Sequence, residues 1–92
     1  MNGVGYRLLG AGKKAEAITV FEQVTQRYPG SANAWDSLSE AQEAAGRTAD
    51  ALAATAKGLD ALATDKALAA PRRDLIEKSL RERKARLEKG GK

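Results

Sequence analysis

Neither cysteine nor histidine occurs anywhere in this sequence of 92 residues. Without cysteine there is no disulfide framework, no thiolate metal site and no cysteine nucleophile. Without histidine, the commonest general base and the commonest zinc ligand are missing as well. Most hydrolytic and metal-dependent chemistry is thereby disfavoured, so we expect a protein that is not an enzyme and that needs neither a cofactor nor a metal.

Proline, aromatic residues and long apolar runs are also scarce. The chain has two prolines and four aromatic residues, although 42% of it is hydrophobic and much of that share is alanine. Small apolar residues favour closely packed helices, so we expect an all-α fold. No run approaches the roughly 18 apolar residues of a membrane span, and the first residues lack a signal-peptide pattern. We therefore expect no membrane contact. The expected location is the cytoplasm by default, and the periplasm if the chain derives from an exported bacterial protein.

The net charge of +4 is distributed unevenly. Residues 1–70 carry seven basic and eight acidic side chains, whereas residues 71–92 carry nine basic and four acidic ones. The basic character therefore belongs to the last quarter of the chain.

A repeat of 34 residues is the clearest internal pattern. Gly12 recurs as Gly46 and Ala17 as Ala51, and each glycine is followed by a basic residue and a segment of helical spacing. This period is typical of helix-turn-helix repeats. Apolar periodicity and the glycine and proline positions predict helices over 4–11, 13–28, 32–45, 48–62 and 71–89.

Each expected helix has a stripe that we predict to face inward. Ser31 and Thr48 are expected to cap two of the helices, and Gly58, costly inside a helix, indicates that another helix backbone passes close by. The predicted inward residues are Ala17, Ile18, Phe21, Val24 and Tyr28; Trp35, Leu38, Gln42 and Ala45; Ala51, Leu52, Thr55, Leu59 and Leu62; and Leu75, Ile76, Leu80, Arg83 and Leu87.

These residues resemble the signature of the tetratricopeptide repeat (TPR). Those at signature positions are Gly5, Gly12, Ala17, Phe21 and Pro29 in a first unit, and Trp35, Leu38, Gly46 and Ala51 in a second. The resemblance implies two antiparallel helix pairs over 1–63, the first truncated at its start, then a linker over 64–70, a capping helix over 71–89 and a tail over 90–92. Departures from the signature are Ser39, Gln42, Thr55 and Ala63.

A narrower resemblance is to the TPR tail of some bacterial serine hydrolases of the beta-lactamase and esterase type. It rests on Asn2, Gly5, Tyr6, Leu8, Leu9, Glu16, Ala17, Ile18, Phe21, Tyr28, Pro29, Ser31, Asn33, Asp36, Ser37 and Leu38. It implies an accessory or oligomerisation domain as the alternative to a free interaction module. Two repeat units are fewer than stable arrays usually need, so we expect the capping helix, self-association or a neighbouring domain to cover the exposed ends. We expect self-association if the truncated first helix leaves apolar surface bare.

Polar side chains with helical spacing form the candidate binding site. Asn33, Asp36, Glu40 and Glu43 are spaced i, i+3, i+7 and i+10, which puts them on one face, turned away from Trp35. The TPR resemblance implies that this face lines the concave groove, with Asn2 and Tyr6 extending it, and that it binds a partner protein or peptide. An acidic groove suits a basic or polar partner. The alternative is that these side chains are simply the solvated face of a surface helix.

Nucleic-acid binding by the basic last quarter is the least favoured function. Arg72, Arg73, Lys78, Arg81, Arg83, Lys84, Arg86 and Lys89 are interspersed with Asp74, Glu77, Glu82 and Glu88 at helical pairing distances. No aromatic side chain is available there to stack on bases. A capping helix with internal salt bridges explains the same pattern.

Overall fold

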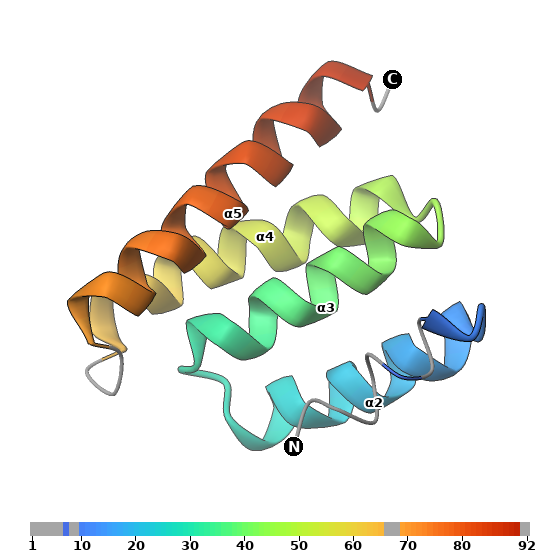
Figure 1. The fold of residues 1–92 in the computed structure, drawn as a ribbon, viewed down its shortest axis with the longest axis horizontal. Coiled ribbons are helices and arrows are strands. Elements are labelled where there is room, and N and C mark those ends of the chain that lie inside the picture. Colours follow the sequence, from blue (N-terminus) through green and yellow to red (C-terminus); the bar gives the residue numbers. More distant parts are fainter. Residues whose placement is uncertain (1–6, 8–9, 66–68, 91–92) are drawn as a thin grey trace.

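The computed structural model describes residues 7, 10–65 and 69–90 of the chain. Its helices are α2 (Lys14–Arg27), α3 (Ala32–Ala44), α4 (Thr48–Thr64) and α5 (Ala70–Gly90). Successive helices run in alternating directions and together form a flat slab of 32 × 31 × 20 Å (Figure 1). All regular structure in the described residues is helical, so the expected all-α fold is confirmed.

The helix bounds follow the sequence pattern to within two residues at each end. The largest difference is at the end of α4, which continues to Thr64 instead of stopping at Leu62. The predicted helix over 4–11 lies almost entirely outside the described residues. Neighbouring helices pack in chain order, and α5 also contacts α3, two helices back in the chain.

Two glycine turns have nearly identical backbone geometry. Gly12 and Gly46 have φ angles of 84° and 79°, a left-handed conformation that glycine adopts without steric cost. The residues that follow them, Lys13 and Arg47, have φ/ψ values of −91°/66° and −89°/72°. The same turn therefore recurs 34 residues apart.

One predicted helix cap is confirmed and the other is wrong. Ala34 N–H donates to Ser31 Oγ at 3.3 Å, as expected of a capping serine. Thr48 is not the cap of α4, because Arg47 holds that position without a side-chain hydrogen bond. Backbone hydrogen bonds close the turn before α4, and in one of them Arg47 N–H donates to Gln42 O at 2.9 Å. Arg47 is thus the N-cap residue, and Thr48 is the first residue of the helix.

The core consists of two apolar clusters that meet at Trp35. The first joins α2, α3 and α4, and the second joins α3, α4 and α5. Trp35 is only half-buried, yet it packs against both clusters, and its Nε1–H donates to Pro29 O at 2.8 Å. The clusters consist of Ala17, Ile18, Phe21, Leu38, Ala41 and Ala54, and of Ala32, Ala61, Leu62, Ile76 and Leu80.

Two residues of the predicted inward stripes are exposed. Tyr28 is 48% exposed because it is the C-cap residue of α2, where φ of −130° takes the chain out of the helix. Leu75 is 70% exposed. It precedes the buried Ile76 by one position, and one helical position is a rotation of about 100°. In α5 this rotation carries Leu75 to the surface, whereas α2 buries both Ala17 and Ile18.

Gly58 occupies a close approach between three helices, as its position inside α4 predicts. A Cβ atom there would lie 2.9 Å from Leu80 Cδ2 and 3.1 Å from Trp35 Cβ. The three nearest atoms belong to side chains of α5 and α3, and not to a helix backbone as predicted from the glycine. The absent side chain lets α5 settle against α4 with Leu80 fully buried.

Candidate functional site

The predicted binding residues that the structure describes all lie on α3. We call Asn33, Asp36, Glu40 and Glu43 the acidic row. All four are half-buried, and α3 has no lysine or arginine to neutralise the three carboxylates. Asn2 and Tyr6, which were predicted to extend the row, lie outside the described residues.

Asp36 is held by α5. Arg83 Nη1 donates to Asp36 Oδ1 at 2.6 Å and to Ser39 Oγ at 3.0 Å. Ser79 Oγ–H donates to the same carboxylate oxygen at 2.9 Å and accepts from Arg83 Nη2 at 3.3 Å. The Arg83 side chain is only 6% exposed, so this ion pair is shielded from water.

Glu43 is held by the next turn of α5. Arg86 donates to both of its carboxylate oxygens, from Nε at 2.9 Å and from Nη2 at 2.8 Å. These hydrogen bonds are the main reason that the pKa of Glu43 is lowered from its usual value, and that of Arg86 is raised. Since the Arg86 side chain is 56% exposed, solvent screens this pair and its contribution to stability is small.

The match between α5 and the acidic row is incomplete. Arg83 Nε lies 3.5 Å from Glu43 Oε1 and, within the described residues, makes no hydrogen bond. Buried polar atoms normally find a partner, so Arg83 Nε is an unsatisfied donor in an otherwise bonded interface.

Sequence reasoning identified the acidic row but missed its counterpart within the chain. The signal was present, because Arg83 falls on the predicted inward stripe of the last helix. An arginine on a buried stripe requires an acidic partner. Pairing that arginine with the carboxylates of 32–45 would have predicted the contact between α3 and α5.

Much of the basic excess of α5 is directed toward the rest of the protein. Arg73 donates to Leu62 O and, at 2.7 Å, to Asp65 O, and so caps the end of α4. Some exposed charged side chains of α5 are not held by a contact to α3, and among them basic and acidic residues are nearly equal in number. They are Arg72, Lys78, Arg81 and Lys89 against Asp74, Glu82 and Glu88. This mixed surface does not form the unbroken basic stripe of a nucleic-acid-binding helix.

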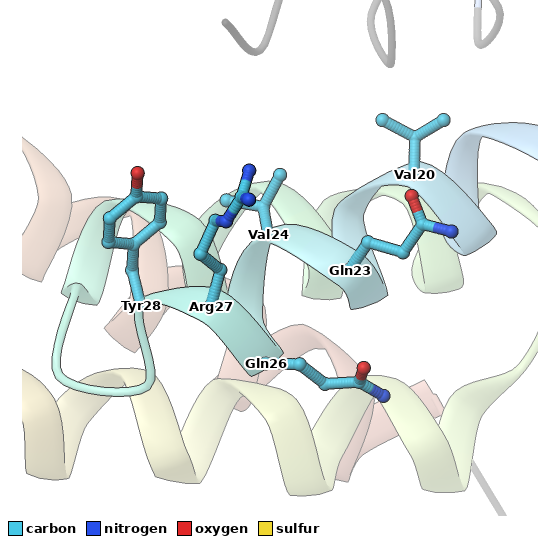
Figure 2. A pocket seen from close by; sticks show the side chains of 6 residues that line it. All are labelled: Val20, Gln23, Val24, Gln26, Arg27 and Tyr28. Atoms are coloured by element: carbon cyan, nitrogen blue, oxygen red, sulfur yellow. The ribbon is translucent and has the colours of Figure 1, made fainter.

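A hollow of about 530 Å³ lies on α2. Figure 2 shows Val20, Val24, Arg27 and Tyr28 pointing to the same side of the helix. The other described lining residues are the amides Gln23 and Gln26. Among the described residues, the lining therefore holds no carboxylate and no acid–base pair for catalysis.

A second hollow, of about 340 Å³, lies beside Trp35 and Lys57. Lys57 Nζ stands 5.7 Å from the centre of the indole ring, a cation–π distance. Asp60 is the acidic residue among the described residues that line it. Across the described residues, no group of three or more acidic side chains is arranged to hold a metal ion.

Comparisons of the chain with protein-family models, with curated proteins and with solved structures found no match. The TPR resemblance therefore stays a prediction, as does the narrower resemblance to the tails of serine hydrolases. None of the described helices combines the length and the apolar character needed to cross a membrane.

Proposed function

We propose that this chain is a non-catalytic protein-interaction module of the TPR type, and that its acidic row binds a basic helix or peptide. One observation carries the proposal: arginines of a basic helix already lie on the row. Arg83 and Arg86 of α5 reach Asp36 and Glu43 with donor–acceptor distances of 2.6 to 2.9 Å. The row is thus chemically suited to guanidinium groups on a helix that lies along α3.

The recurrence of local geometry supports the repeat part of the proposal. Gly12 and Gly46 have the same left-handed conformation 34 residues apart, and each precedes a helix that begins without a side-chain cap. Helices that alternate in direction and pack in chain order are the arrangement expected of stacked helix-turn-helix units.

Electrostatics supports the choice of a basic partner. The 13 residues of α3 carry three carboxylates and no basic side chain, and two of the carboxylates pair with arginines of α5. Complementary charge speeds encounter and disfavours acidic partners, because like charges brought together cost free energy. Glu40 is the best residue for testing the row, because Asp36 and Glu43 also hold α5 in place.

Binding can be tested with three helical peptides of equal length, one basic, one neutral and one acidic. We expect the full chain to bind the basic peptide selectively, with an affinity that falls as salt is raised. Glu40→Lys should weaken that binding about tenfold, or about 1.4 kcal/mol, whereas the matched control Glu22→Lys on the exposed face of α2 should leave it unchanged. Equal binding of the basic and acidic peptides would contradict the proposal.

A further inference from the structure

The first half of α5 is anchored by apolar packing. Ile76 and Leu80 are buried in the second core cluster, and Leu80 fills the space that Gly58 leaves open. Arg73 ties the same half to the end of α4. Burial of apolar side chains is the main source of stability in proteins, so this half is an integral part of the fold.

The second half, residues 81–90, is held differently, and we call it the strap. In this half, Arg83 binds Asp36 and Ser39 of α3, Arg86 binds Glu43, and Leu87 is a buried apolar side chain. An exposed pair such as that of Arg86 adds little stability. A buried ion pair such as that of Arg83 with Asp36 also adds little net stability. When the contact opens, water solvates both charges and offsets most of the lost attraction. The strap is therefore the less firmly held half of α5.

The strap also fits the acidic row imperfectly. Arg83 is 95% buried, yet its Nε stands 3.5 Å from Glu43 Oε1 and makes no hydrogen bond within the described residues. Guanidinium groups bind carboxylates best through two parallel hydrogen bonds. Arg86 achieves this with Glu43, whereas Arg83 does not, so a better-placed helix can improve on the contact.

We propose that the strap is a displaceable occupant of the acidic row, and that it is exchanged for a helix from a partner protein. The partner helix carries two arginines about one turn apart, followed directly by a leucine. This is the pattern that Arg83, Arg86 and Leu87 of the strap place against the protein. The inference rests on the proposed function and adds both the partner's chemistry and a built-in competitor that restricts access to the row.

Competition between strap and partner can be measured with a synthetic peptide of residues 78–92 as the probe. The strap variant Arg83→Ala/Arg86→Ala frees the row in the full chain. It should bind the probe at least tenfold more tightly than the wild type. The matched control Arg81→Ala/Lys84→Ala removes the same charge from the strap, but these residues pair with acids inside α5. Its affinity should stay within about twofold of the wild type.

The outcomes separate this inference from the proposed function. Equal probe affinity for the wild type and a folded strap variant means that the row binds but the strap does not compete, which overturns the inference alone. No binding to either protein overturns both. A wild-type dimer that the strap variant loses in sedimentation means that the strap is exchanged between copies of this chain, which also overturns the inference.

A second measurement applies even if the strap variant fails to fold. Amide hydrogen exchange of the nitrogen-15-labelled wild-type chain can be followed by NMR, with and without unlabelled probe. Amides of 82–90 should exchange at least tenfold faster than those of 73–80, and saturating probe should accelerate them further. Equal protection of both halves, or no effect of the probe on 82–90, overturns the inference.

Discussion

Gly58→Ala should destabilise the wild-type protein, but it should be neutral or stabilising in a variant in which Leu80 is shortened to alanine. In the wild type a Cβ at this position would lie 2.9 Å from Leu80 Cδ2, and Leu80 is fully buried and cannot swing away freely. Overpacking of this kind typically costs 1–3 kcal/mol. Replacing an interior helical glycine by alanine gains about 1 kcal/mol in helix propensity. We therefore expect Gly58→Ala to destabilise the wild type by about 1 kcal/mol.

The same change behaves differently in a Leu80→Ala background. Leu80→Ala alone should cost about 3–5 kcal/mol, because it removes a fully buried side chain and leaves a cavity. With Leu80 shortened, the 2.9 and 3.2 Å contacts of the new Cβ disappear and the 3.1 Å approach to Trp35 Cβ remains. Gly58→Ala should then be neutral or stabilising by up to about 1 kcal/mol, a coupling of about 1–2 kcal/mol.

Urea unfolding is a suitable assay for this cycle. Trp35, the single tryptophan, reports on the junction of the two core clusters, and circular dichroism reports on the helices. A domain of this length has a total stability of about 5–14 kcal/mol, so all four proteins can be measured if the wild type lies above the lower end. The same penalty for Gly58→Ala in both backgrounds would refute the packing that we describe between α4 and α5.

Three further predictions concern other parts of the fold. Trp35→Ala should destabilise the protein by about 2–4 kcal/mol in urea unfolding, below the usual upper range for tryptophan because the ring is half-buried; an unchanged midpoint would contradict its place between the two clusters. Gly12→Ala and Gly46→Ala should each cost about 1–2 kcal/mol, because alanine is strained at positive φ; unequal costs, with one near zero, would argue against equivalent turns. The pKa of Glu43 is lowered in the folded state, so the stability that its pair with Arg86 provides is present above the unfolded-state pKa near 4.5 and is lost as pH falls through the lower folded-state value. Glu43→Gln should remove that part of the acid sensitivity below about pH 4.5, and an identical pH profile for the variant would show that the pair contributes nothing.

The helices could be read from the sequence because local chemistry sets their ends. Gly12 and Gly46 supply left-handed turns, and Ser31 caps α3 as its side chain allows. These features act over a few residues, so they do not depend on the tertiary fold. Thr48 failed as a predicted cap because Arg47 could close the turn through its backbone.

The side-chain environment was harder to predict because it depends on contacts between distant residues. Leu75 and Ile76 are equally apolar in sequence, and only the direction of α5 against α4 decides which one is buried. Asp36 looks like a solvated carboxylate until Arg83, 47 positions later, is placed beside it. The acidic row was therefore found from helical spacing, and its occupation by the strap needed the fold.

An NMR titration tests the central claim, that the acidic row binds a basic helix, most directly. The full chain, labelled with nitrogen-15, is titrated with an unlabelled helical peptide of the Arg-x-x-Arg-Leu pattern. We predict saturable chemical-shift changes at the amides of α3 from Asn33 to Glu43 and in the strap, with α2 unaffected. Shifts confined to α2, or none at peptide concentrations that saturate other basic-helix receptors, would contradict the claim.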